Sequence, residues 1–316
     1  MRLVIALGGN AMTAADGSAT PADQRAAVQE AMESVADLVV AGHEVVLTHG
    51  NGPQVGNLLL KNELAADTVA PVPLDWCGAQ TQATIGMLVL DTLDVALAAR
   101  GSDRRAAALV SRTLVDADDP AFAEPTKPIG RYLPEAEAAL MIEHGQHWVE
   151  VGSRGWRRVV GSPEPQRMLD LAAAQALIAD GFVVVCAGGG GIPTVHDPGT
   201  GYTGVEAVID KDVASALLAE QVRADALVIA TDVDAAVVGW GTPDARPLGE
   251  LDAAEMRRIA AEGHFAAGSM GPKVEAVTRF AERCGRVGVI TSLPRIADAV
   301  AGTAGTRVVP ATVTAP

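Results

Sequence analysis

Residues 182–191 read FVVVCAGGGG, an apolar, β-branched run that passes directly into four glycines. Runs of this length and composition are typical of strands that are buried on both faces of a parallel sheet. Residues 1–10, MRLVIALGGN, have the same form. A third apolar run, ALVIA at 226–230, passes into TDVD instead of glycines. The repeated pattern predicts buried strands that each end in a short loop of unusual composition.

Segments with helix signals separate these strands. Thr20 followed by Pro21 is a typical N-cap and first helical residue, and Gly42 is a typical helix end. The expected strands are 2–7, 43–48, 105–110, 182–187, 226–230, 287–290 and 307–309, and the expected helices are 21–41, 74–100, 166–180, 210–221, 253–262 and 272–283. This alternation predicts the α/β class, as a three-layer αβα sandwich around a largely parallel central sheet.

Residues 116–161 interrupt the alternation. The segment is rich in proline and contains a predicted hairpin at 147–160. We therefore expect a small inserted subdomain that protrudes from the α/β body.

The composition excludes several classes of partner. The 316 residues include 39 acidic and 24 basic side chains, a net charge of −15 that disfavours binding to the phosphate backbone of nucleic acid. The three cysteines lie far apart with no CxxC pair, as expected in a reduced compartment. No apolar run approaches the ~18 residues of a membrane span. We expect a soluble, cytoplasmic protein with no nucleic-acid or membrane partner.

Four strand ends carry unusual loops, which should meet at one edge if the sheet is parallel. Open α/β sheets bind ligands at this edge, and glycine lets the backbone approach an anion closely. Glycine-rich turns are also common after strands, but four together favour a binding site. His49, within one loop, either contacts the substrate or holds the loop. The loops are GGN (8–10), HGNGPQ (49–54), GGGG (188–191) and TDVD (231–234).

Only four of the 24 basic residues are lysines, and three of them lie in glycine or proline motifs. Lys211 in IDKD and Lys273 after GSMGP fall in the first turn of predicted helices, where a cation opposes the helix dipole by roughly 0.3–1 kcal/mol. A polyphosphate between the dipole and each ammonium would explain this placement. Lys127, between two prolines, could reach the same edge from the insertion, whereas Lys61 is expected on the solvated surface.

The lysines and the missing motifs together point to one chemistry. Three mobile cations with no obvious nucleophile favour phosphoryl transfer, which depends on positioning and charge neutralisation. Asp212 could orient the ammonium groups, although it and Asp210 could instead only cap the helix. The sequence contains no GxxxxGK[ST], GxGxxG, GxSxG or HExxH motif. His144 and His147 are three residues apart with no third ligand nearby in sequence, and are expected to be solvated.

Seven segments together resemble carbamate kinases, a branch of the amino-acid kinase family. The match follows the expected order over nearly the whole chain, and HGNGPQVG with KPIG and GSMGPK is specific for this branch. Related acetylglutamate kinases usually carry a lysine in the first-strand glycine motif, and Lys127 replaces it here. The segments are ALGGNA (6–11), THGNGPQVG (48–56), KPIG (127–130), GGGGIP (188–193), AVIDKDVAS (207–215), TDVD (231–234) and GSMGPKVEA (268–276).

The resemblance implies reversible phosphoryl transfer between ATP and carbamate, with Mg²⁺ bridging the phosphates and no protein ligand of the metal assigned. It also implies a homodimer, and one domain over 1–316 with an acceptor-side lobe (1–115 and 162–187) and a nucleotide-side lobe (188–316). The implied catalytic residues are Lys127, Lys211 and Asp212. Those around carbamate and the transferred phosphoryl group are Gly8, Gly9, Asn10, Gly50, Asn51 and Gly52, and those for the nucleotide are Lys211, Thr231, Asp232, Met270 and Lys273.

Two positions depart from the family pattern. Val237 stands where similar enzymes often have a tyrosine that flanks the nucleotide, and Ala267 replaces a common proline. The loss of an aromatic partner could weaken base stacking. Two other functions stay open: a kinase of the same family for another small acid, and a nucleotide sensor without catalysis.

Overall fold

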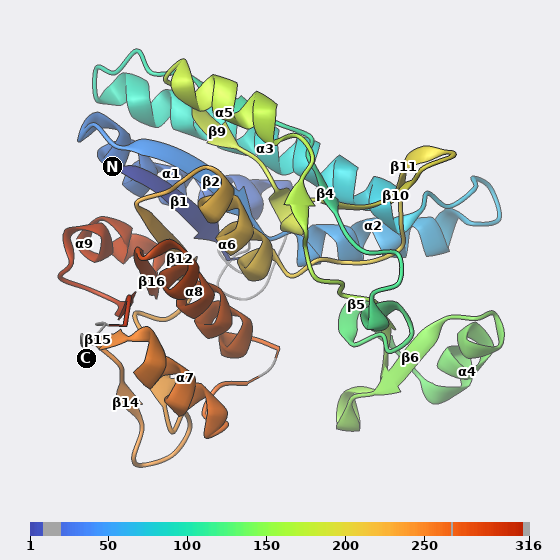
Figure 1. Ribbon diagram of the computed structural model, residues 1–316. Helices are drawn as coiled ribbons and strands as arrows, with labels where there is room; N and C mark the ends of the chain where they lie inside the picture. Colours follow the sequence, from blue (N-terminus) through green and yellow to red (C-terminus); the bar gives the residue numbers. More distant parts are fainter. Residues whose placement is uncertain (9–19, 267, 312–316) are drawn as a thin grey trace.

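The computed structural model describes residues 1–8, 20–266 and 268–311 (Figure 1). Its centre is an eight-stranded sheet in the order β15-β17-β16-β12-β1-β2-β9-β3. Neighbouring strands are parallel except for the β16–β17 pair. The strands are β1 (Arg2–Leu7), β2 (Glu44–His49), β3 (Ala106–Ala108), β9 (Val183–Val185), β12 (Ala226–Thr231), β15 (Glu250–Asp252), β16 (Val287–Ser292) and β17 (Thr306–Val309).

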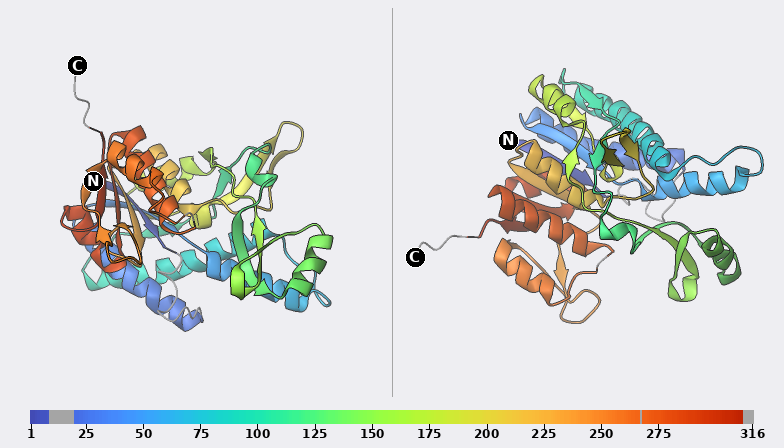
Figure 2. Two further views of the ribbon diagram at one scale, coloured as in Figure 1. Left: turned by 90° about the horizontal axis from the view of Figure 1, so that it is seen from below. Right: turned by 45° about the vertical axis from the view of Figure 1, so that its right-hand side comes forward.

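Helices cover both faces of this sheet (Figure 2). Successive residues of a strand point to opposite faces, and β1 follows this rule. Leu3 and Ile5 pack into one hydrophobic cluster, whereas Val4 and Ala6 pack into the other. The predicted three-layer αβα sandwich is therefore confirmed. One face carries α1 (Pro21–Val40), α3 (Leu74–Ala99) and α9 (Ile296–Ala301), and the other carries α5 (Leu171–Ala179), α6 (Lys211–Gln221), α7 (Ala253–Ala261) and α8 (Met270–Cys284).

The inserted segment forms a separate antiparallel sheet to one side of the body (Figures 1 and 2). Its strands pair in the order β5-β7-β6, and Leu133, Ala138 and Trp148 form a small core under α4. The elements are β5 (Lys127–Leu133), α4 (Glu135–Glu143), β6 (His147–Glu150) and β7 (Trp156–Val160). Lys127 is the first residue of this sheet, at its junction with the body.

Two smaller sheets complete the strand pairing. The four-stranded sheet has the order β11-β10-β4-β8, and β13 pairs with β14. These strands are β4 (Arg112–Leu114), β8 (Arg167–Met168), β10 (Ile192–Asp197), β11 (Gly201–Gly204), β13 (Val237–Val238) and β14 (Arg246–Pro247). Helix α2 (Gly52–Ala65) and the short 3₁₀ turns Pro120–Phe122, Gly152–Arg154, Gly188–Gly190 and Leu293–Arg295 complete the described elements.

Some predicted helix boundaries were wrong, one of them because tertiary strand pairing overrides a local helix signal. The helix expected from 166 begins only at Leu171, since Arg167 and Met168 pair with β4 as a strand. The Asp170 carboxylate accepts hydrogen bonds from the backbone N–H and guanidinium of Arg112, which holds this corner. Helix α8 begins at Met270, two residues before the expected start.

Helix α3 is long and apolar enough to cross a membrane by length and composition alone, although no continuous apolar run suggested this. Half of its most apolar 18-residue window is buried in the fold. Its buried residues, such as Ile85 and Leu93, pack into the cluster that covers one face of the sheet. Its hydropathy is therefore that of a helix packed against the core.

Candidate active site

Four neighbouring strands bring the unusual loops to one edge of the sheet. Strands β12, β1, β2 and β9 are adjacent and parallel, so their carboxyl ends point the same way. The Gly8 N–H donates to the Ala230 carbonyl at 2.9 Å, and the Gly50 N–H donates to the Leu7 carbonyl at 3.0 Å. These bonds continue the ladder into the loops. The predicted Gly9 and Asn10 lie outside the described residues.

Asp210 holds the start of α6 and also binds the insertion. Its Oδ1 accepts hydrogen bonds from the backbone N–H groups of Asp212 at 2.9 Å and Val213 at 3.4 Å, as an N-cap does. Its Oδ2 accepts a hydrogen bond from the Lys127 ammonium at 2.7 Å. The capping that the sequence suggested for both aspartates belongs to Asp210, which also ties Lys127 to the body.

Asp212 lies between the other two lysines of the site. It is only 3% exposed, and its two oxygens accept hydrogen bonds from the ammonium groups of Lys211 at 2.5 Å and Lys273 at 3.1 Å. Lys273 comes from α8, which packs against α6. The carboxylate therefore fixes two cations from different helices at one point.

Burial and charge act against each other in this cluster. Burial lowers the pKa of the Lys211 ammonium, although the Asp212 carboxylate opposes the change. Burial also acts to raise the pKa of the Asp212 carboxyl, but the charges and hydrogen bonds of Lys211 and Lys273 outweigh it and hold that pKa below its usual value. Asp212 is therefore ionised at neutral pH and supplies a fixed negative charge.

Two hydroxyl groups that the sequence analysis did not single out support Lys211. The Ser215 hydroxyl donates to the Lys211 carbonyl at 2.6 Å and lies 2.7 Å from the Thr48 hydroxyl of β2. Both side chains are fully buried. They fasten the first turn of α6 to the end of β2, and only their position in the predicted motifs AVIDKDVAS and THGNGPQVG could have pointed to them.

The loop after β2 is held by its own side chains. His49 is 1% exposed, and its Nδ1 lies 2.9 Å from the Gly50 carbonyl. Burial, with a smaller contribution from the charge of Lys211, lowers the pKa of His49 to about 4. The Asn51 amide donates to the Thr81 hydroxyl at 2.9 Å, just before α2 begins at Gly52. A buried, neutral His49 favours the loop-holding interpretation of this residue over contact with substrate.

The glycines after β9 have a packing reason. A Cβ on Gly188 would lie 2.3 Å from Nε2 of His49, and one on Gly189 would lie 2.2 Å from Nδ2 of Asn51. Gly189 also has a φ of +66°, which disfavours other residues. The GGGG run thus lets the β2 loop pack directly against its backbone. This packing is a second reason for the glycines, in addition to the predicted approach to an anion.

A cavity of about 640 Å³ opens beside Lys273. Val237 lines it, and so does Trp240, an aromatic residue that the sequence analysis missed. Neither Lys127 nor Lys211 is among the lining residues, but Asp212 links Lys211 to Lys273 at its edge. The predicted site residues that line the cavity are Gly8, Thr231, Asp232, Met270 and Lys273.

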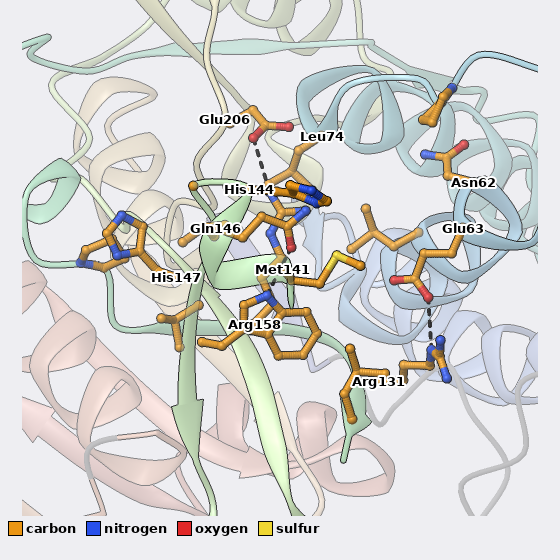
Figure 3. Close-up of a pocket in the computed structure, with 18 of the residues that line it drawn as sticks. Asn62, Glu63, Leu74, Arg131, Met141, His144, Gln146, His147, Arg158 and Glu206 are labelled. Carbon is orange, nitrogen blue, oxygen red and sulfur yellow. Dashed lines mark hydrogen bonds and ion pairs between the residues drawn. The ribbon is translucent and has the colours of Figure 1, made fainter. Parts of the chain in front are cut away.

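A second cavity, of about 770 Å³, lies between the insertion and α2 (Figure 3). None of the predicted site residues lines it. Two ion pairs join its walls, from Arg131 to Glu63 at 2.9 Å and from Arg158 to Glu206 at 3.1 Å (Figure 3). The larger cavity is therefore separate from the lysine cluster.

His144 and His147 line this second cavity, and both are exposed. Among the residues that the structure describes, no group of three or more His, Cys, Asp or Glu side chains could hold a metal ion. Within the described ranges, the cavity that suits an anionic ligand is therefore the one of about 640 Å³. Asp212 fixes Lys211 and Lys273 at its edge.

Comparisons with known proteins identify the family of the chain. The model of the amino acid kinase family matches residues 1–292. The carbamate kinases of Thermococcus kodakarensis and Trichomonas vaginalis are 44% and 42% identical to the chain, and each alignment covers 98% of this chain and at least 99% of the relative. A carbamate kinase structure from Giardia lamblia bound to AMP-PNP has a TM-score of 0.92 and 41% identity over 98% of both chains. The chain therefore belongs to the carbamate kinase branch of the amino acid kinase family, and it is a kinase, a phosphotransferase.

Proposed function

We propose that the protein catalyses reversible phosphoryl transfer between ATP and carbamate. The observation that carries this proposal is the placement of Asp212 between Lys211 and Lys273 at the edge of the 640 Å³ cavity. The names of the full-length relatives support carbamate as the acceptor, and the AMP-PNP bound to the Giardia lamblia enzyme supports an adenine nucleotide.

The proposed mechanism is a direct, in-line transfer. An oxygen of carbamate forms a bond to the γ-phosphorus of ATP as the bond to the bridging oxygen of ADP breaks, and carbamoyl phosphate and ADP result. Negative charge on the transferred phosphoryl group is stabilised by Lys211 and Lys127, while Asp212 holds Lys211 and Lys273 in position. No covalent enzyme intermediate is needed.

The two substrates would approach from different sides of this centre. We assign carbamate and the transferred group to the loops after β1 and β2, and the nucleotide to the cavity beside α8. These are the acceptor-side lobe, 1–115 and 162–187, and the nucleotide-side lobe, 188–316. The acceptor residues are Gly8, Gly9, Asn10, Gly50, Asn51 and Gly52, and the nucleotide residues are Lys211, Thr231, Asp232, Met270 and Lys273.

Magnesium fits this donor set as a companion of the nucleotide. Mg²⁺ keeps several water ligands and binds proteins through one or two carboxylates together with substrate phosphates. Asp232 is the carboxylate among the described lining residues and is the one placed to take part, while Lys273 supplies the lining cation. When bound, the ion would neutralise charge on the phosphates. The lysine–aspartate cluster holds its own arrangement by direct hydrogen bonds.

We further propose a cytoplasmic homodimer that works in arginine catabolism, in the direction from ADP and carbamoyl phosphate to ATP. The dimer follows from the resemblance to carbamate kinases. Helix α3 also presents exposed apolar side chains, Met87 at 51% and Val95 at 64%, which a second copy could cover.

The decisive experiment is to incubate the protein with ADP, Mg²⁺ and carbamoyl phosphate and to measure ATP. ATP well above a protein-free control is expected. No ATP above that background would contradict the proposal. Formation of ATP from acetyl phosphate but not from carbamoyl phosphate would instead indicate a kinase for another small acid, and calorimetric binding of ADP without turnover would indicate a nucleotide sensor.

A further inference from the structure

Trp240 is an exposed aromatic residue that lines the 640 Å³ cavity. Its exposed fraction is 70%, high for so large an apolar side chain. Among the described residues, Trp240 makes no hydrogen bond or ring contact and belongs to no hydrophobic cluster. An unpartnered indole at the wall of a cavity points to a ligand that covers it.

The backbone around Trp240 is held in a defined turn. Gly239 and Gly241 on either side have φ values of +67° and +79°. The Thr242 N–H and hydroxyl both donate to the Gly239 carbonyl, at 3.0 Å and 2.7 Å. This turn follows β13, which pairs with β14. The indole is therefore presented by a closed turn rather than by a loose loop, which limits the entropy lost when a ligand stacks on it.

The other rings around the cavity are already engaged. Phe265 packs against the hydrophobic core, and the His264 ring lies 3.2 Å from the Glu262 carboxylate. Val237 lines the cavity but has no ring. Of the described lining residues, Trp240 is the one whose aromatic face is left for a ligand.

The cavity combines two kinds of wall. Lys273, paired with Asp212, supplies a cation, whereas Trp240, Val237 and Met270 supply apolar surface. A nucleotide has the same two parts, a charged phosphate chain and a flat base. Stacking on an aromatic ring is the usual way in which a protein holds a base without reading its edge.

We propose that Trp240 supplies the base-stacking surface for the nucleotide, in place of an aromatic residue at Val237. This inference rests on the proposed function, since it requires that the cavity bind a nucleotide. It makes Trp240 a determinant of nucleotide affinity and leaves the transfer step to the lysine cluster.

The test compares Trp240→Ala and Trp240→Phe with Trp76→Ala as a matched control. Trp76 is 60% exposed in the first turn of α3 and lines neither of the cavities described above. We expect Trp240→Ala to raise the Kd of ADP roughly tenfold, about 1.4 kcal/mol, by calorimetry, with Trp240→Phe close to the wild type. Trp76→Ala should bind ADP normally. Quenching of tryptophan fluorescence by ADP should be lost in Trp240→Phe and kept in Trp76→Ala.

A ligand without a base separates stacking from a disturbed loop. Inorganic tripolyphosphate should bind Trp240→Ala and the wild type equally, because it has no ring to stack. Equal weakening of tripolyphosphate and ADP would overturn the proposal, since Trp240 would then act by holding the cavity. An unchanged Kd of ADP in Trp240→Ala would also overturn it. If the wild-type protein bound no ADP, the failure would lie in the proposed function, whatever Trp240 did.

Discussion

Two aspartates at the start of α6 hold the lysines of the site in different ways. Asp212 lies between Lys211 and Lys273, and the side chains are 4%, 14% and 14% exposed. Asp210 holds Lys127 from the insertion in a pair whose side chains are 18% and 33% exposed. The buried cluster joins two helices that pack together, whereas the more open pair crosses the junction between the insertion and the body.

The difference separates two tasks that phosphoryl transfer requires. A buried carboxylate with two cations keeps its geometry, because each charge would be costly to leave alone in a low dielectric. A partly exposed pair is weaker and can exchange its partner for a substrate anion. In the proposed function, Asp212 would be a fixed electrostatic centre and Lys127 a movable cation.

The largest effect is expected from Asp212→Asn. Removing one partner from a buried ion pair typically costs 3–5 kcal/mol, and here two ammonium groups would lose their shared carboxylate. We expect the free energy of unfolding in urea to fall by about that amount and turnover to fall at least a hundredfold, about 2.7 kcal/mol. Glu206→Gln, in the partly exposed pair with Arg158, should change stability by less than about 1 kcal/mol. Near-normal turnover in Asp212→Asn would remove the basis for a fixed centre.

His49 is a further buried ionisable residue at the site, and it tests whether burial there affects stability as it does at Asp212. Its pKa is lowered to about 4, so between pH 6.5 and 4 the unfolded chain binds the proton that the folded protein does not. Stability should therefore fall as the pH falls through this window, by about 3 kcal/mol in total for this residue. Urea unfolding between pH 7.5 and 4.5 should show a flatter profile for His49→Gln than for the wild type. The exposed His147→Gln serves as control, and equal slopes for His49→Gln and the wild type would show that His49 does not titrate in this way.

Substitutions of the lysines directly test the difference between the buried Asp212 cluster and the partly exposed Asp210–Lys127 pair. Lys211→Ala and Lys127→Ala should each lower kcat at least tenfold, about 1.4 kcal/mol, because each removes a cation from the transferred group. Lys127→Ala should leave the free energy of unfolding within about 1 kcal/mol of the wild type, since its pair is partly exposed. Lys61→Ala, on the exposed face of α2, should change neither quantity. Wild-type kcat in either Lys211→Ala or Lys127→Ala would refute the role assigned to that lysine.

The smallest effect should separate the two functions of Asp210. Asparagine is as good an N-cap as aspartate, whereas alanine costs about 1 kcal/mol at this position. Asp210→Asn should therefore keep the stability of α6, and Asp210→Ala should lose about 1 kcal/mol in thermal or urea unfolding. Both variants lose the ion pair with Lys127, so a similar, severalfold fall in kcat/KM is expected. A fall only in Asp210→Ala would mean that capping alone explains the residue.

Local signals were enough to predict the main elements. The apolar run at 2–7 and the Pro21 helix start appear in the structure where they were expected, since each depends on a few neighbouring residues. The start at 166 was wrong because Arg167 and Met168 pair with residues 53 and 55 positions earlier in the chain, which no local pattern encodes. Strand β10 was missed for the same reason, since it pairs with β4, whereas β11 was missed although it forms a local hairpin with β10.

The site residues also fall into those that local motifs could predict and those that depend on distant contacts. Motifs singled out Lys211, Lys273 and Asp212, but no spacing in the chain could predict that Asp210 rather than Asp212 binds Lys127. Trp240 was missed because an isolated tryptophan in a loop gives no periodic signal. Its relevance follows only from the cavity that α8 and the β13 turn form together.

The sequence by itself determined the parallel α/β body and the scarcity of lysine outside glycine and proline motifs. Both are properties of short segments, in which burial and backbone preference act on adjacent residues. Only the tertiary structure decided which carboxylate holds which ammonium and which aromatic face is left open. Those outcomes depend on contacts between distant parts of the chain. The two ion pairs join residues 61 and 83 positions apart, and burial determines how much each pairing matters.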